Sequence, residues 1–209
     1  MMLPLGGRAG ERAGTATASQ IAKRTMADDK KTLRARMRAL RDEFAMTIGG
    51  VIEPPPALLA RFAPGAIVSS YVPVGSEADP TAIAFAARER GCTIVLPHVT
   101  SRESPVRFFE WTPEQPLIDG PLGLRQPSTD APEMDPEIVL TPLLAFDSML
   151  NRLGQGAGHY DRAFERLPGA WRVGVAWSVQ QVEALATDPW DVPLHGIVTE
   201  AAAFGEVAA

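Results

Sequence analysis

The chain has 209 residues, 45% of them hydrophobic and 22% charged, and a formal net charge of −5 at pH 7. This composition is typical of one soluble globular domain, while the negative charge argues against a general nucleic-acid binder, and no apolar run reaches the roughly 18 residues of a membrane span. The single cysteine, Cys92, has no internal disulfide partner, which predicts a reducing compartment and a cytoplasmic protein.

The first 25 residues differ in composition from the rest of the chain. They are rich in Gly, Ala and Thr and carry four basic residues against one glutamate. They lack the continuous apolar core of a secretory signal, although a leader that bears arginine and few acids is also typical of a transit peptide. We expect residues 1–27 to be a flexible extension and residues 28–209 to form the folded domain.

A helix is predicted from Asp28 or Asp29 to about Phe44, because an aspartate can cap its first turn. Apolar residues recur in it at spacings of four, three and four and form one face: Leu33, Met37, Leu40 and Phe44. A neighbouring stripe of the same helix is basic: Lys30, Arg34, Arg38 and Arg41. On pattern alone, this basic stripe is an exposed and solvated helix face.

Strands alternate with a helix in the middle of the chain. Strands are predicted at residues 66–72, 93–96 and 107–111, and a helix begins after Asp79. This alternation predicts an α/β fold: a single domain with a mixed, largely parallel sheet flanked by helices in a Rossmann-like three-layer architecture. Ligands of such sheets bind beyond the carboxyl ends of the strands. Glu77 lies at such a place, although the pattern alone also fits an ordinary exposed carboxylate.

A phosphate-binding loop is predicted farther along the chain. An apolar run at residues 138–144 predicts a buried strand, and residues 160–167 predict a helix. Between them, glycines stand at every second position: Gly154, Gly156 and Gly158. Glycines let backbone N–H groups approach an anion, and a helix N-terminus adds partial positive charge. Arg152 at the loop entry is a candidate phosphate contact, and Asp161 just after the loop is a candidate Mg²⁺ ligand.

The spacing of these glycines excludes two common nucleotide-binding motifs. The chain has no Gly-Lys-Ser/Thr sequence and therefore lacks a Walker A loop. The spacing Gly-x-Gly-x-Gly differs from the dinucleotide fingerprint, and the next predicted strand, residues 173–177, is followed by Ser178 rather than by an acid. The loop belongs to a less common class of anion-binding loops.

The C-terminal part predicts a strand at residues 171–177, a short helix or turn at 179–185, and a last strand at 196–199. Asp191 stands shortly before that last strand. The chain has three histidines, and their spacing is too wide to predict a zinc site: His98, His159 and His195.

One stretch resembles the signature of a known family: Pro142-Leu-Leu-Ala-Phe-Asp147 followed by Asn151-Arg-Leu-Gly-Gln-Gly-Ala-Gly-His-Tyr-Asp161. The family is that of 5-formyltetrahydrofolate cyclo-ligases, also called 5,10-methenyltetrahydrofolate synthetases, and the resemblance extends over residues 28–200. It implies a ligase that forms a carbon–nitrogen bond and converts 5-formyltetrahydrofolate to 5,10-methenyltetrahydrofolate, using ATP and Mg²⁺ and releasing ADP and phosphate. It implies a cytoplasmic enzyme that binds a reduced folate. We expect a monomer without nucleic-acid or membrane partners.

The resemblance also implies roles for individual residues. ATP contacts are implied for a basic helix segment and for the glycine loop: Lys30, Lys31, Thr32, Leu33, Arg34, Arg152, Leu153, Gly154, Gln155, Gly156, Ala157, Gly158, His159 and Tyr160. Folate contacts are implied for Val72, Glu77 and Tyr160, and magnesium contacts for Asp161 and Asp191. No residue is assigned as a nucleophile, because phosphoryl transfer depends on positioning and charge neutralisation.

The chain departs from the family pattern at several of these positions. His159 replaces the first of two aromatic residues, and Gln155 and Ala157 stand where the family often has a cation. His195 stands where the family often has another acid. We therefore expect phosphate contact to depend on Arg152, on backbone N–H groups and on the first helix.

Two other interpretations remain at this point. Sugar-phosphate isomerases and CoA transferases use related architectures with anion-binding loops, and such an enzyme would not need ATP. A non-catalytic regulator that binds a nucleotide or folate could have kept the loops and lost turnover through the changes at His159 and His195. Formation of methenyltetrahydrofolate with and without ATP separates the three interpretations.

Overall fold

The computed structural model describes the backbone of residues 18–208 and the side chains of residues 29–208 except Leu122. The helices are α1 (Ala18–Thr47), α2 (Pro56–Leu59), α3 (Thr81–Glu89) and α4 (His159–Arg166), with two 3₁₀ turns, η1 (Pro121–Gly123) and η2 (Ser178–Gln180). The strands are β1 (Ile67–Ser69), β2 (Thr93–His98), β3 (Arg107–Glu110), β4 (Ile118–Asp119), β5 (Arg125–Gln126), β6 (Ile138–Pro142), β7 (Ala145–Phe146), β8 (Arg152–Leu153), β9 (Trp171–Val175), β10 (Gly196–Val198) and β11 (Ala203–Gly205).

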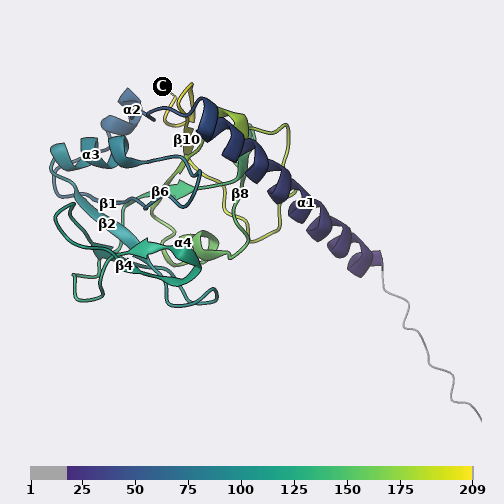
Figure 1. The fold of residues 1–209 in the computed structure, drawn as a ribbon, viewed down its shortest axis with the longest axis horizontal. Helices are drawn as coiled ribbons and strands as arrows, with labels where there is room; N and C mark the ends of the chain where they lie inside the picture. Colours follow the sequence, from purple (N-terminus) through teal and green to yellow (C-terminus); the bar gives the residue numbers. More distant parts are fainter. Residues whose placement is uncertain (1–17, 209) are drawn as a thin grey trace, which may run out of the picture.

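A seven-stranded sheet forms the centre of the molecule (Figure 1), with the strand order β11-β10-β9-β6-β1-β2-β3. The inner strands run parallel, and the edge strands β3 and β11 are antiparallel to their neighbours. The predicted mixed, largely parallel sheet is confirmed. Strands β1 and β6 are adjacent, yet the chain leaves them in opposite directions, to β2 through α3 and to β9 through α4. This reversal opens a crevice beyond the carboxyl ends of β1 and β6, which is where open α/β sheets bind ligands.

Helices cover both faces of the sheet, so the expected three-layer architecture is confirmed. On one face, Leu58 of α2 and Ile83 of α3 belong to the same core cluster as Leu140 of β6. On the other face, Phe164 of α4 clusters with Val139 of β6. Val139 and Leu140 are successive residues of one strand and therefore point to opposite faces. Because both faces are buried, β6 is a continuous apolar run rather than an alternating one.

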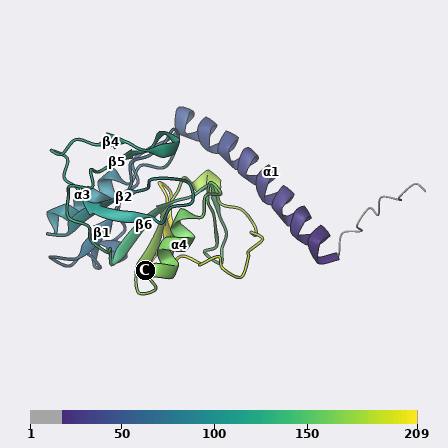
Figure 2. The ribbon, with the colours of Figure 1, turned by 90° about the horizontal axis from the view of Figure 1, so that it is seen from below.

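Helix α1 begins earlier than the sequence predicted. The expected start was Asp28 or Asp29, whereas the helix begins at Ala18 and both aspartates lie inside it. The preceding segment is rich in Ala, Lys and Arg, which favour helix, so the helix continues through it. The N-terminal part of α1 extends away from the sheet (Figures 1 and 2). Residues 1–17 of the expected extension lie outside the described residues, and the domain boundary at residue 28 stays a prediction.

The apolar face predicted for α1 is confirmed and attaches the helix to the rest of the domain. Met37 is buried against Leu144, which precedes β7, and Leu153 of β8. About two turns farther on, the Phe44 ring packs on the Trp177 ring with centroids 5.8 Å apart. In the described part of the chain, no helix has both the length and the apolar character that a membrane span requires.

The structure contains several short elements that the sequence did not predict: α2, the β4–β5 and β7–β8 hairpins, and β11. The strands of both hairpins have two residues each, which is too short for an alternating pattern to be recognised. They form because tertiary contacts supply partners. The β7–β8 hairpin matters most for the site, because Arg152 is the first residue of β8. The sequence indicated only a loop between β6 and the glycines.

We predict that Gly205→Ala destabilises the fold by about 1–3 kcal/mol, because Gly205 has a left-handed φ of 70° and a Cβ there would lie 2.6 Å from the His195 carbonyl oxygen. Urea unfolding measures the effect. Gly169→Ala is the matched control, because a Cβ at Gly169 meets no atom within 4 Å. Equal stability of the two variants would contradict this account of the end of β11, where Gly205 pairs with Gly196.

Candidate functional site

A cleft of about 600 Å³ lies beyond the carboxyl ends of β1, β2 and β6, at the crevice created by the chain reversal. Its walls come from α1, from the loop at residues 72–77, from the segment between β8 and α4, and from the loop that contains Asp191. It brings together most of the residues predicted from the sequence: Lys30, Arg34, Val72, Glu77, Arg152, Leu153, Gly154, Gln155, Gly156, Ala157, Gly158, His159, Tyr160, Asp161 and Asp191. Lys31, Thr32 and Leu33 do not line it. Lys31 and Thr32 are exposed on α1, and Leu33 packs against the cluster around Met37.

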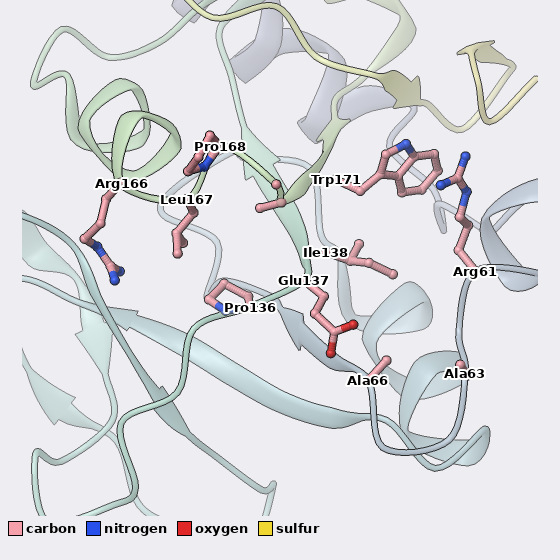
Figure 3. A pocket seen from close by; sticks show the side chains of 12 residues that line it. Arg61, Ala63, Ala66, Pro136, Glu137, Ile138, Arg166, Leu167, Pro168 and Trp171 are labelled. Carbon is pink, nitrogen blue, oxygen red and sulfur yellow. The ribbon is translucent and has the colours of Figure 1, made fainter.

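A second hollow, of about 560 Å³, lies where β6 and β9 begin, at the amino ends of these strands (Figure 3). Both of its arginines already have ionic partners: Arg61 pairs with Glu206, and Arg166 pairs with Asp135. In Figure 3 the Glu137 side chain points toward Ala66, and its carboxylate accepts a hydrogen bond from the Ile67 N–H of β1. The charged groups of this hollow thus already have partners within the protein. We therefore take the cleft at the carboxyl ends as the candidate site.

A tight turn after β7 determines where Arg152 lies. The carboxylate of Asp147 is buried and accepts hydrogen bonds from the backbone N–H groups of Met149 and Asn151, each at 3.0 Å. Its second oxygen accepts hydrogen bonds from the Asn151 side chain and from the Leu185 N–H, also at 3.0 Å. Leu150, inside the turn, has a left-handed φ of 63°. Four donors therefore converge on one carboxylate and direct the chain back as β8.

Arg152, the first residue of β8, is held at the cleft wall by three contacts. One guanidinium nitrogen donates to the Val192 carbonyl oxygen at 2.5 Å, and another forms an ion pair with Asp161. The guanidinium carbon lies 4.7 Å from the centroid of the Phe164 ring. Burial lowers the pKa of Arg152, and the charge of Asp161 acts in the opposite direction. The result is a rigid, charged fork beside the start of α4.

Arginines of α1 hold the glycine loop against the helix. The Nε of Arg34 donates to the Gly154 carbonyl oxygen at 3.0 Å, and a Cβ at Gly156 would lie 3.4 Å from the Arg34 guanidinium carbon. Gly156 and Gly158 have left-handed φ values of 99° and 69°, a backbone conformation that favours glycine at both positions. Arg38 donates to the Gln155 side chain at 2.8 Å. Oxygens of the loop therefore accept hydrogen bonds from two arginines of α1.

The opposite side of the loop is tied to the segment after β2. Arg102 donates to the Gly156 carbonyl oxygen at 3.2 Å, and the Nε2 of His159 lies 2.9 Å from the Arg102 carbonyl oxygen. Burial lowers the pKa of His159, so its ring is neutral at pH 7 and Nε2–H acts as the donor. The departure at His159 thus replaces an aromatic residue by one that fastens the loop.

The two candidate metal ligands each have a cationic partner. Asp161 pairs with Arg152, and Asp191 lies 3.2 Å from Lys30, whose amine also lies 2.6 Å from Asp188. Burial opposes the charge of Lys30, but its hydrogen bonds to the two aspartates prevail and raise its pKa. Among the described residues, no group of three or more His, Cys, Asp or Glu side chains could hold a metal by itself. Two hard carboxylates on one cleft fit a Mg²⁺ that also takes phosphate and water oxygens.

Tyr160 and His195 occupy different environments. Burial raises the pKa of Tyr160, so its hydroxyl stays protonated and can donate a hydrogen bond into the cleft that it lines. His195 does not line the cleft. Its Nδ1 accepts a hydrogen bond from the Arg172 N–H at 2.9 Å, and its ring stacks on Trp171. The replacement of an acid by His195 therefore lies outside this site.

Several lining residues were not predicted as site residues: Arg38, Arg41, Asp42, Tyr71, Ser76, Arg102 and Arg125. For Arg38 and Arg41 a signal was present, because their spacing from Lys30 and Arg34 puts them on one side of α1. On pattern alone we interpreted that stripe as solvated, and within it the resemblance gave ATP roles only to Lys30 and Arg34. Arg102 lies in an irregular loop, and nothing in its local sequence indicates contact with a glycine loop more than fifty residues away.

We predict that Asp147→Ala destabilises the protein by about 2–3 kcal/mol, because four donors lose a buried carboxylate acceptor. Chemical denaturation measures the change. Ser148→Ala in the same turn is the control, since Ser148 is exposed. If the Asp147 variant unfolds like the control, the turn is held by other contacts.

Comparison with known proteins agrees with the geometry. The 5-formyltetrahydrofolate cyclo-ligase family model matches residues 26–200. A curated protein of Escherichia coli named 5-formyltetrahydrofolate cyclo-ligase is 29% identical over 184 residues, which cover 80% of this chain and 96% of that protein. A protein of the same name from Haemophilus influenzae is 38% identical over 101 residues, 44% of this chain and about half (52%) of that protein.

Solved structures support the same fold. An NMR structure of Aquifex aeolicus 5,10-methenyltetrahydrofolate synthetase has a TM-score of 0.61 at 24% identity and covers 85% of this chain and 92% of its own. The corresponding synthetase of Mycoplasma pneumoniae has a TM-score of 0.58 at 21% identity and covers 81% of this chain and 98% of its own. The ligase class and the fold expected from the sequence are confirmed, and the chain belongs to the 5-formyltetrahydrofolate cyclo-ligase family.

Proposed function

We propose that this protein converts 5-formyltetrahydrofolate to 5,10-methenyltetrahydrofolate in a reaction that uses ATP and Mg²⁺ and releases ADP and phosphate. The observation that carries the proposal is a single cleft in which cations of α1 and the glycine loop adjoin a wall formed by Val72, Glu77 and Tyr160. Two ligands that react with each other need such adjoining subsites. Membership of the family supports the reaction, and the single cysteine supports the proposed cytoplasmic location. We also propose that the protein is a monomer.

The proposed ATP subsite consists of Lys30, Arg34, Arg152 and the backbone of residues 153–160. Arg34 and Arg152 are forked donors suited to phosphate oxygens, and both are already fixed by contacts to the protein. Fixed donors lose less conformational entropy when a ligand binds than mobile surface side chains do. Backbone N–H groups of the glycine loop and the start of α4 add further donors.

The proposed metal ligands are Asp161 and Asp191, with phosphate oxygens and water completing the shell. A bound Mg²⁺ would neutralise charge on the phosphates and hold them in line for transfer. The pairs Arg152–Asp161 and Lys30–Asp191 keep both kinds of charge at one wall of the cleft. Each carboxylate has further oxygen lone pairs for a cation, and each cation has further N–H donors for a phosphate.

The chemistry requires activation of an amide-like formyl oxygen, which is a poor leaving group. Transfer of the γ-phosphoryl group to that oxygen, with ADP leaving, makes phosphate the leaving group. The neighbouring N10 of the folate then attacks the formyl carbon and loses its proton, and the carbon–oxygen bond breaks as phosphate departs. The residues of the cleft position the two substrates and stabilise charge; none of them needs to act as a nucleophile.

The test is formation of methenyltetrahydrofolate, followed by its absorbance, with purified protein and 5-formyltetrahydrofolate. We expect product only when ATP and Mg²⁺ are both present, with one ADP released per product. Turnover without ATP would favour an enzyme of another class. Binding of both ligands without product would favour a non-catalytic binding protein.

Removal of the cations of α1 tests the ATP subsite. We predict that Lys30→Ala and Arg34→Ala each raise the KM for ATP and lower kcat/KM by roughly ten- to a hundredfold, because one hydrogen bond to a charged group stabilises by about 1.5–3 kcal/mol. Arg36→Ala is the control, because Arg36 is exposed on the same helix and does not line the cleft. An unchanged KM for ATP in both variants would make this helix face a solvated surface.

Asp161→Asn tests the metal subsite. Asp161 does not cap α4, whose N-cap is Gly158; it pairs with a buried arginine instead. We predict some loss of thermal stability, a larger loss of turnover, and partial recovery of turnover at high Mg²⁺, because asparagine keeps the shape but removes the anionic metal ligand. Asp135→Asn, at the exposed pair with Arg166, should leave the Mg²⁺ dependence unchanged. Identical Mg²⁺ titrations of the two variants would limit Asp161 to a structural role.

A further inference from the structure

One arginine of the cleft has an arrangement that neither the ATP subsite nor the packing of α1 explains. The side chain of Arg41 is only 5% exposed, although it is the longest cationic type and lies on a helix surface. Its Nη1 is buried and has no hydrogen-bond partner. A buried N–H without a partner is costly, and burial lowers the pKa of this guanidinium against the opposing effect of Glu77. We expect such a buried cation to stabilise a neighbouring anion.

The neighbour is the carboxylate of Glu77. The Nη1 of Arg41 lies 3.7 Å from Glu77 Oε1, and among the described residues Arg41 is the only one with a cationic atom within 4.0 Å of that carboxylate. The Glu77 side chain is only 9% exposed, and its remaining accessible surface lines the cleft. An approach of about 0.8 Å would turn this contact into a charge-assisted hydrogen bond of ordinary length.

The same arginine holds the loop that carries Glu77. The Nε of Arg41 donates to the Ser76 hydroxyl at 3.0 Å, and this hydroxyl donates to Asp42, the next residue of α1. Glu77 Oε2 accepts a hydrogen bond from the Val74 N–H at 3.0 Å. The direction of the carboxylate is thus determined from one side by its own loop and from the other side by α1.

We propose that Arg41 is a positioning residue for the reduced-folate step: it acts through Glu77, by holding that carboxylate toward the folate, and it does not itself contact the substrate. The proposal rests on the proposed function, in which Glu77 meets the folate. It separates two tasks along α1. Lys30 and Arg34, at one part of the helix, serve ATP, while Arg41, about two turns farther on, serves the folate.

The test is a double-mutant cycle with Arg41→Gln, Glu77→Gln and the combined variant, followed by steady-state kinetics for both substrates and by calorimetric binding of 5-formyltetrahydrofolate without ATP. We expect Arg41→Gln to raise the KM and the Kd for the folate by about tenfold or more, and to change the KM for ATP by less than about twofold. The combined variant should bind the folate no more weakly than Glu77→Gln alone, because Arg41 acts only through Glu77.

Two further variants separate positioning from a general structural role. Arg41→Lys keeps the charge but not the fork, and we expect it to recover part of the folate affinity. Arg36→Gln, exposed on the same helix, should match the wild type in both KM values. Thermal melting of every variant identifies any that fail to fold, and Arg41→Lys then decides the matter.

The outcomes distinguish this proposal from the proposed function. If the wild type turns over but the effects of Arg41→Gln and Glu77→Gln multiply, or both KM values rise equally, the positioning role is wrong and the function stands. If the wild type binds 5-formyltetrahydrofolate without turning it over, the binding cycle still decides the role of Arg41. If the wild type fails to bind this folate, both proposals are overturned.

Discussion

The packing of α1 across the ends of the sheet is the interaction on which the site depends. The apolar face around Met37 and Phe44 attaches the helix to the β7–β8 hairpin and to Trp177. Burial of such a face stabilises by about 25 cal/mol per Å² of apolar surface, so the helix position is determined by the core rather than by its charges. The positions of the charged side chains follow from this packing. Once Met37 is buried, the basic stripe must face the glycine loop and the loop that carries Glu77.

Buried and half-buried charges in this cleft are almost all paired. Arg152 has Asp161, Lys30 has Asp188 and Asp191, and the partly buried arginines of α1 bind backbone or side-chain oxygens of the loops. Pairing reduces the cost of removing these charges from water, although it does not by itself make the fold more stable than an apolar wall would. We therefore interpret the charge network as a device for binding anionic ligands. It keeps donors and acceptors in fixed positions before a ligand arrives.

Local sequence patterns predicted the long elements and missed the short ones. β6 and β9 were recognised because a strand buried on both faces is a continuous apolar run. The β7–β8 hairpin was not recognised, since two-residue strands show no alternation, and the start of α1 was placed ten residues too late because an aspartate inside a helix was interpreted as its cap. For the site, the spacing of the glycines predicted the anion-binding loop and Asp161, and the resemblance to the family added Asp191. Arg102 became visible as a site residue only through its contacts, whereas Arg41 lies on the predicted basic stripe and was left unassigned until its contact with Glu77 was seen.

The sequence by itself determined the α/β class, the family and the residue types of the anion-binding loop, because these depend on periodicity and on local motifs. Only the tertiary structure decided which charges share one cleft. The stripe on α1 has the same pattern whether it faces water or a ligand. His159 and His195, which look like equivalent departures in the sequence, differ because one fastens the glycine loop and the other lies outside the cleft. Such differences arise from contacts between segments that are far apart in the chain, and a local sequence pattern does not indicate which distant segment it will contact.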